Sequence, residues 1–226
     1  MNDSLGKAPA GDQDGGPVRM SRQELRSSLW LASLYAIRML GLFLVLPVFA
    51  LHARQLPGGY DPAWVGFAFG AYGLTQALFQ LPLGMLSDRL GRKKVIYLGL
   101  AVFAAGSFIA AAADSVAWLL IGRAVQGAGA VSAAVTALLA DLTREEVRTR
   151  AMASIGLTIG LTFAASMVAS PLLTRYLGVP GLFALTGGLC VLALGVVAWV
   201  TPNPQQGKFH EDAEMQTSRI GEVLHN

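Results

Sequence analysis

The sequence has few charged residues for its length. Only 14% of its 226 residues are Asp, Glu, Lys or Arg, whereas about a quarter is usual in soluble domains. The charges lie in short clusters, and apolar runs of roughly 20 residues separate them, which is the length of a helix that crosses a membrane. With 54% hydrophobic residues and a mean hydropathy of +0.52, the composition excludes an ordinary soluble domain and predicts an all-α membrane protein.

Cysteine, and acids or histidines within the apolar runs, are also scarce. The single cysteine, Cys190, excludes an intramolecular disulfide and a cysteine metal cluster. None of the 14 acidic residues falls inside an apolar run, and His52 lies at the edge of one. Proton-coupled transporters usually carry an acid or histidine at mid-membrane. The sequence therefore predicts no metal site and no cofactor, and it shows no mid-membrane proton carrier.

Six apolar runs organise the chain into three regions. Residues 1–21 have the composition of a disordered tail, residues 22–203 form a six-helix unit, and residues 204–226 form a polar loop after it. The predicted spans are at about 29–53, 64–86, 95–113, 116–139, 152–174 and 181–200.

Lysine and arginine predict the orientation of these spans. Thirteen of the 17 fall on the side that holds both termini, and two, Arg54 and Arg175, fall on the other. Positive residues concentrate on the cytoplasmic side of membrane proteins. We therefore expect a multi-pass protein with both termini in the cytoplasm. Because the basic residues follow the membrane flanks rather than one helix face, we expect no nucleic-acid binding.

Two span exits resemble each other. Pro-Leu-Gly-Met-Leu-Ser-Asp-Arg-Leu-Gly begins at Pro82 in the second span, and Pro-Leu-Leu-Thr-Arg-Tyr-Leu-Gly begins at Pro171 in the fifth. The two exits fall on opposite sides of the predicted membrane. This pattern predicts two three-helix units in inverted topology, which is common in secondary transporters.

The loop between the second and third spans carries the clearest motif, Gly-Met-Leu-Ser-Asp-Arg-Leu-Gly-Arg-Lys-Lys over residues 84–94. Positive-inside sorting explains its basic residues, and Gly91 fits a helix C-cap. Neither explains Asp88. A carboxylate one helical turn from Arg92 forms a charge-assisted bond at the membrane edge, and such a bond can exist in one conformation and break in another.

This loop resembles the signature loop of the major facilitator superfamily, whose members have twelve spans in two six-helix halves. The resemblance covers about residues 22–203 and implies that the chain is the N-terminal half. It also implies a cytoplasmic gate built on the motif residues and on the acid that ends the fourth span: Gly84, Asp88, Arg89, Gly91, Arg92 and Asp141. Thr-Arg-Glu-Glu at residues 143–146, with the fifth and sixth spans, resembles the YajR-type drug-efflux group of the inner membrane.

The fourth span contains Arg123 followed by Gln126 and Gly127 on the same face. A buried charge costs at least a few kcal/mol in a membrane, so Arg123 should face a cavity or a partner, unless it snorkels to the nearby outer interface. The Arg-x-x-Gln-Gly-x-Gly pattern resembles the fourth-helix motif of proton-coupled exporters in the superfamily. Arg38 lies near the middle of the first span, too deep to snorkel, and we expect a cavity or pairing role for it.

Other residues indicate helix faces. Tyr72, Gln76 and Gln80 recur every four residues in the second span and either line the substrate path or bond neighbouring helices. In the fifth span, Gly156 and Gly160 predict a packing face, and Pro171 predicts a bend. The superfamily's antiporter signature ends this helix in Gly-Pro, whereas this chain has Ser-Pro.

The functional prediction is a transporter of small solutes working by alternating access, with proton-coupled drug efflux as the main expectation. Such a transporter needs a second six-helix half. That half would also supply the proton carrier, unless the gate carboxylates carry the proton. Two alternatives stay open: solute uptake by symport, and a six-helix half-transporter acting as a homodimer or interaction partner. An intramembrane serine protease is excluded because no histidine lies deep in a span to activate a serine, His52 being at the outer edge of the first. We therefore expect no enzymatic activity.

Overall fold

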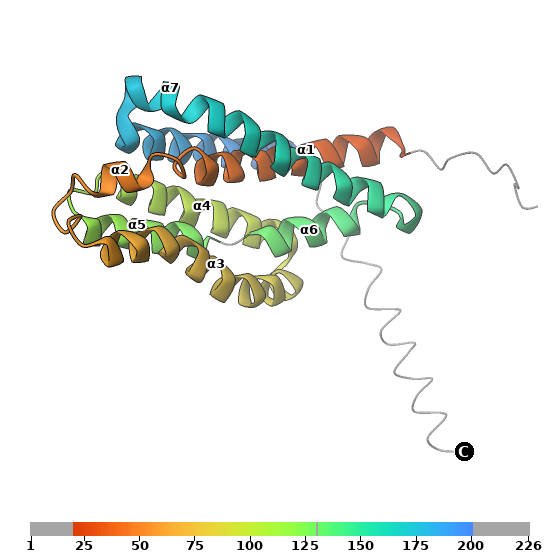
Figure 1. Cartoon of the computed structure of the whole chain (residues 1–226). Helices are drawn as coiled ribbons and strands as arrows, with labels where there is room; N and C mark the ends of the chain where they lie inside the picture. Colours follow the sequence, from red (N-terminus) through yellow and green to blue (C-terminus); the bar gives the residue numbers. More distant parts are fainter. Residues whose placement is uncertain (1–19, 130, 201–226) are drawn as a thin grey trace, which may run out of the picture.

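The computed structural model describes residues 20–129 and 131–200, with side chains up to residue 195. This part of the chain is helical and contains no strand (Figure 1). The predicted terminal regions lie, for residues 1–19 and 201–226, outside the described residues. The helices are α1 Arg22–Phe43, α2 Phe49–Ala53, α3 Pro62–Leu90, α4 Arg92–Ala111, α5 Val116–Ala128, α6 Ser132–Asp141 and α7 Glu145–Val200.

Local sequence signals set where these helices begin. Ser21 caps α1 in a reciprocal arrangement. The Ser21 hydroxyl accepts from the backbone N–H of Glu24, and the Glu24 carboxylate accepts from the backbone N–H of Ser21. Asp61 caps α3 ahead of Pro62, which has no N–H to leave unpaired at the first helical position. Gly91 separates α3 from α4 with φ 94°, a conformation that glycine adopts without strain.

Two of the predicted spans are each divided into two helices. The first runs as α1 and α2, separated by residues 44–48, because Pro47 has no N–H for a continuous helical ladder. The fourth runs as α5 and α6, which are separated around Gly129. A Cβ at Gly129 would lie 2.4 Å from the carbonyl oxygen of Gly99 in α4. The close approach of the two backbones therefore requires glycine there.

The fifth and sixth spans are the two arms of α7. Gly178 leaves the helical conformation at φ 66° and ψ 174°, and Figure 1 shows the chain doubling back at this end of the bundle. The predicted reversal between the fifth and sixth spans is therefore confirmed. Pro171 lies inside the first arm, where the backbone keeps helical angles, so its predicted bend stays a prediction.

The helices pack as expected for half of a transporter of inverted repeats. α5 packs on both α3 and α4, and α1 packs along α7. Contacts reach α1 from both arms of α7: Ser170 in the first bonds the carbonyl oxygen of Leu44, and Thr186 in the second lies against Gly41. If the first three spans are exchanged with the last three, the fourth span takes the place of the first. Its contacts with the second and third spans then correspond to the contacts of the first span with the fifth and sixth.

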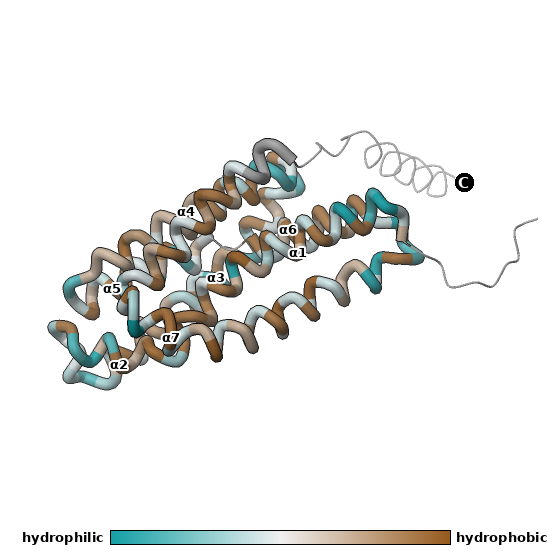
Figure 2. The backbone as a smooth tube through the Cα atoms, turned by 90° about the horizontal axis from the view of Figure 1, so that it is seen from above, coloured by the Kyte–Doolittle hydropathy of each residue, from teal (hydrophilic) through white to brown (hydrophobic). Residues whose placement is uncertain are grey.

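Composition and burial fit a membrane-spanning bundle. Among the described residues, three stretches are long and apolar enough to cross a membrane, namely Arg92–Ala111, Val116–Asp141 and Glu145–Gly195, the last of which covers two predicted spans. α1 and α3 fall short of this test, because α1 carries Arg38 and α3 carries Tyr72 and its glutamines. Figure 2 shows apolar residues along the helices and hydrophilic residues mainly in the turns at their ends.

Candidate transport site and gate

The charged residues of the signature loop meet at one end of the bundle, here named the Asp141 end. Asp88 lies in the last turn of α3 and forms an ion pair with Arg92, the first residue of α4. The Nε of Arg92 also donates to Oδ2 of Asp141, the last residue of α6, at 3.2 Å. The structure thus brings together the three charges that the sequence predicted to cluster, and Arg92 joins three helices.

A serine that sequence reasoning missed completes this cluster. Nη1 of Arg92 donates to Oγ of Ser87 at 2.7 Å, and that hydroxyl donates to the carbonyl oxygen of Gly84 at 2.6 Å. A Cβ at Gly84 would lie 3.3 Å from Cβ of Ala133, so α3 approaches α6 closely here. Arg89, in contrast, is exposed and forms no hydrogen bond or ion pair within the described residues. It belongs to the predicted gate by motif position alone.

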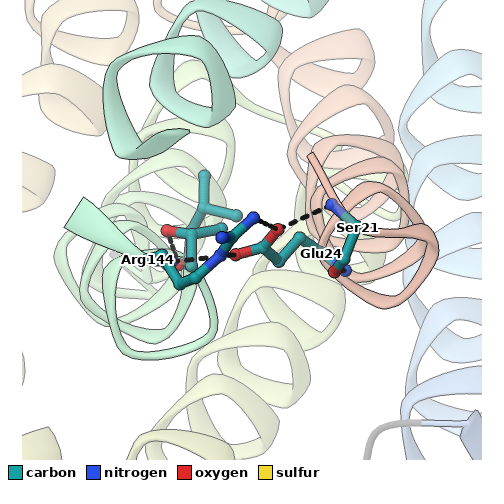
Figure 3. Close-up of polar contacts among 5 residues, drawn as sticks. Ser21, Glu24 and Arg144 are labelled. Carbon is teal, nitrogen blue, oxygen red and sulfur yellow. Dashed lines mark hydrogen bonds and ion pairs between the residues drawn. The ribbon is translucent and has the colours of Figure 1, made fainter. Parts of the chain in front are cut away.

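A second ion pair at the Asp141 end was also missed. Figure 3 shows Glu24 of α1 between Ser21 and Arg144, which precedes α7. Nε of Arg144 donates to Oε1 of Glu24 at 2.9 Å. The hydrogen bonds from Arg144 hold the pKa of Glu24 far below its usual range, and Glu24 in turn raises the pKa of Arg144. Glu24 and Arg144 are 120 positions apart, so no local pattern in the sequence indicates that they pair.

Arg123 lies inside the bundle and is 1% exposed, so it does not snorkel to the interface. Its Nη1 donates to Oε1 of Gln126 at 2.7 Å, and Nε2 of Gln126 donates to Oγ of Ser107 at 2.9 Å. Its guanidinium carbon is 4.6 Å from the ring centroid of Tyr72 and 5.8 Å from that of Phe49. These two rings belong to two different apolar clusters, so Arg123 lies between the two cores of the bundle.

Arg38 is the second buried cation, at 2% exposure. Its Nη1 donates to Oγ of Ser132 in α6 at 2.7 Å, and its Nη2 donates to Oε1 of Gln76 in α3 at 2.9 Å. The guanidinium carbon is 5.9 Å from the ring centroid of Phe103. Two of the three predicted polar residues of the second span, Tyr72 and Gln76, thus contact a buried arginine.

The two arginines form one layer with an excess of positive charge. The rings of Tyr72 and Phe103 meet edge to face at 6.4 Å between centroids, and each ring contacts one of the guanidinium groups. Within the described residues, neither arginine pairs with a carboxylate, and both Nε atoms and the Tyr72 hydroxyl lack partners. A buried cation without a counter-ion is costly. A negative charge placed beside this layer would therefore stabilise it.

The comparisons with known proteins decide the family. The family model described as Major Facilitator Superfamily matches residues 31–224. The chain belongs to the major facilitator superfamily. It is 47% identical, over 91% of its length and 45% of the relative's, to the inner membrane transport protein YajR of Escherichia coli strain K12. The chain spans about half the length of the curated relatives it matches.

Two further relatives extend this picture. The class E tetracycline resistance protein of Escherichia coli is 31% identical over 82% of the chain and 47% of that protein. A crystal structure described as a bacterial homolog to the human lysosomal transporter Spinster, inward-facing and occupied, matches with a TM-score of 0.69 at 16% identity. That match covers 84% of this chain and 46% of the other. It establishes the fold of one half of a major facilitator transporter.

The glycines of this major facilitator half fall into two groups. A Cβ at Gly127 would lie 2.1 Å from the carbonyl oxygen of Tyr72, so α5 and α3 touch through their backbones. Gly156 and Gly160 are different, since nothing among the described residues lies within 4 Å of a Cβ built at either. The packing face predicted for these two glycines has no occupant within this half and stays a prediction.

Ser170 explains the departure from the antiporter signature of the superfamily. Its hydroxyl donates to the carbonyl oxygen of Leu44 at 2.6 Å and is fully buried. That carbonyl lies at the break between α1 and α2, where the N–H of Val48 bonds Val45 instead. The serine thus satisfies a buried acceptor that a glycine at this position would leave unpaired.

Proposed function

We propose that the chain is the N-terminal half of an exporter that exchanges small drug-like solutes for protons across the inner membrane by alternating access. The observation that carries this proposal is the bridge that Arg92 makes between Asp88 and Asp141. By the distribution of positive charge, the Asp141 end is the cytoplasmic one, and both termini lie on that side.

The bridge has the properties of a gate that opens and closes. The side chains of Arg92, Asp88 and Asp141 are 22%, 59% and 27% exposed, so water competes for each contact. Partly exposed ion pairs contribute only about 0–1 kcal/mol each. Such a cluster can hold the cytoplasmic side closed in one state and rearrange in another at a cost within reach of substrate binding.

The buried arginine layer supports a role in coupling. Arg38 and Arg123 place two positive charges inside this half without a carboxylate partner among the described residues. We propose that the second half supplies an acid near this layer. The positive charge of the layer keeps this acid ionised, and protonation of the acid releases it from the arginines. The positive field of the layer would then oppose proton binding by this acid, and the same field would couple proton binding to substrate binding.

The outer faces of α3 and α7 support the need for a second half. Nothing among the described residues lies within 4 Å of a Cβ built at several of their glycines, which in α3 are Gly66, Gly70 and Gly73. Helices in membranes associate through small residues that let backbones approach. We propose that some of these glycines receive helices of the second half, while the remaining outer surface contacts lipid.

Outward transport is proposed because of the relatives. The class E tetracycline resistance protein resembles the chain along most of its length, and a class G relative of Vibrio anguillarum is 36% identical over 68% of it. Tetracycline is therefore a reasonable first probe. The competing direction, uptake by symport, predicts accumulation in vesicles of the opposite orientation.

The test uses the native gene product in everted and right-side-out vesicles, with tetracycline and other drugs as probes and a fluorescent dye that reports the pH gradient. We expect accumulation in everted vesicles, together with dissipation of an imposed pH gradient when the drug is added. Accumulation only in right-side-out vesicles would establish uptake instead. Transport that leaves the pH gradient unchanged would remove the proton from the proposal.

Asp88→Asn tests the gate, and Asp114→Asn, exposed in the turn before α5 at the other end, is its matched control. The amide introduced by Asp88→Asn is neutral and cannot form the ion pair with Arg92. We expect transport to fall by about twofold to fivefold, with membrane insertion unchanged, because the amide loses an ion pair that contributes up to about 1 kcal/mol. Undiminished transport by Asp88→Asn would contradict the gate, whereas the control is expected to transport normally.

A further inference from the structure

All the acceptor positions of the Glu24 carboxylate are in use (Figure 3). Oε1 accepts from the backbone N–H of Arg144 at 3.1 Å and from its Nε at 2.9 Å. Oε2 accepts from Nη2 of Arg144 at 3.2 Å and from the backbone N–H of Ser21 at 2.7 Å. An ionised carboxylate has about four lone-pair sites, so this one is saturated.

Capping of α1 accounts for only one of these four bonds. The reciprocal arrangement with Ser21 needs one carboxylate oxygen of Glu24, and the other three bonds go to a residue 120 positions away. The Glu24 side chain is 8% exposed while that of Arg144 is 56% exposed. The buried carboxylate of Glu24 thus accepts hydrogen bonds from both the side chain and the backbone of the more exposed Arg144.

The connection that Glu24 holds is the one that carries a gate residue. α6 ends at Asp141 and α7 begins at Glu145, so only residues 142–144 lie between them. On one side Asp141 accepts a single 3.2 Å bond from Arg92 of α4. On the other side Arg144 is held by Glu24 of α1. The connection is therefore fixed from two helices at once.

The two attachments differ in how firmly they hold. The Arg92–Asp141 contact is one bond between partly exposed groups, and such pairs are weak. The Glu24–Arg144 pair is bidentate and adds a backbone N–H, which makes it geometrically specific. The firmer attachment of the 142–144 connection is therefore the one that Glu24 makes.

We propose that Glu24 is a positioning residue of the gate, acting through Arg144 to keep Asp141 within reach of Arg92. This inference rests on the proposed function of the Asp88–Arg92–Asp141 cluster. Glu24 contacts none of the three gate residues through a hydrogen bond or ion pair. The Glu24–Arg144 pair is therefore separate from the bonds that the gate residues make with one another.

The first measurement needs no transport. Spin labels are attached through Lys94→Cys in α4 and Arg148→Cys in α7, two exposed positions, in the native gene product with Cys190 and any further cysteine replaced by serine and reconstituted in lipid nanodiscs. Pulsed electron resonance gives the distribution of distances between the labels. We expect Glu24→Ala and Glu24→Gln to broaden this distribution, whereas Glu145→Gln, which removes an adjacent exposed acid, leaves it unchanged.

Glu24→Gln guards against misfolding of the alanine variant, because it keeps a side-chain oxygen as an acceptor. A distribution that is equally narrow in wild type and in a folded Glu24→Gln variant would overturn the positioning role. So would a broadening of the same size in Glu145→Gln, since it would show that any loss of negative charge loosens this end.

The second measurement is transport by the native gene product. We expect Glu24→Gln to lower the transport rate by about threefold to thirtyfold, the range of couplings carried by indirect contacts, with the substrate KM unchanged. Arg144→Gln removes the other member of the pair and should lower the rate by a similar factor, and the double variant Glu24→Gln with Arg144→Gln should be little slower than either single variant. Fully additive losses in the double variant would overturn the proposal. If the wild type itself transports nothing, the proposed function fails, while the distance measurement still decides whether Glu24 positions Asp141.

Discussion

The guanidinium of Arg123 stacks on the ring of Tyr72, with its central carbon 4.6 Å from the ring centroid. The arginine comes from α5 and the tyrosine from α3, and both are nearly inaccessible to water. A cation over an aromatic face gains about 2 kcal/mol or more when desolvated. The ring thus supplies part of the electrostatic partner that no described carboxylate provides.

Substitutions at Tyr72 separate the ring from its hydroxyl. The hydroxyl has no partner among the described residues, so Tyr72→Phe should change the free energy of unfolding by less than about 0.5 kcal/mol, or stabilise the chain. Tyr72→Leu removes the ring and should destabilise it by about 1–3 kcal/mol. Unfolding by SDS in mixed micelles measures both. Equal losses from the two variants would show that the hydroxyl, not the ring, matters.

Gly127 and Gly73 give opposite expectations for the same substitution. A Cβ at Gly127 would lie 2.1 Å from the Tyr72 carbonyl oxygen and 2.2 Å from Oγ1 of Thr75, whereas Gly73 has nothing within 4 Å. Gly127→Ala must push α5 away from α3 and should destabilise the chain by about 1–3 kcal/mol. Gly73→Ala should be neutral or stabilising by up to about 1 kcal/mol through helix propensity. The same micelle unfolding assay compares them, and a neutral Gly127→Ala would contradict the backbone contact.

The sequence predicted the charged cluster at the Asp141 end because one short motif carries two of its members. Asp88 and Arg92 are only four positions apart, so they stay close even though Gly91 interrupts the helix between them. Asp141 entered only through the resemblance to the superfamily, since it is 49 positions from Arg92. The Glu24–Arg144 pair was missed because no local pattern links two residues 120 positions apart.

Breaks within the spans were missed for a different reason. Hydrophobic length predicted one helix for residues 29–53 and one for 116–139, and the apolar character does continue across both breaks. Pro47 interrupts the first, but hydrophobic length alone does not register the backbone N–H that a proline lacks. The second break depends on how closely Gly129 approaches α4. This approach is a tertiary contact, and the sequence of one span alone does not predict it.

The Ser170–Leu44 bond predicts the cost of restoring the superfamily's glycine. Ser170→Gly and Ser170→Ala both leave the buried carbonyl oxygen of Leu44 without the hydroxyl that donates to it at 2.6 Å. We expect each to destabilise the chain by about 1–3 kcal/mol, the cost of a buried unpaired acceptor. Ser154→Ala is the control, because its hydroxyl bonds only Ala151 in its own helix. A loss no larger than that of Ser154→Ala would show that Leu44 finds another donor.

Glu24 predicts how stability depends on pH. In the folded protein, the bonds from Arg144 lower the pKa of the Glu24 carboxyl group from the ordinary value of 4.5 to far below the usual range. A lowered carboxyl pKa stabilises the fold above the unfolded pKa, and the gain is lost as the pH falls from there toward the folded pKa. The stability difference between wild type and Glu24→Gln should therefore be largest near neutral pH and shrink progressively below about pH 4.5. Unfolding curves across this range measure it, with Glu145→Gln as the reference whose difference from wild type stays nearly constant. A Glu24→Gln difference that does not change on acidification would mean that the ion pair with Arg144 does not hold the carboxylate in its charged form.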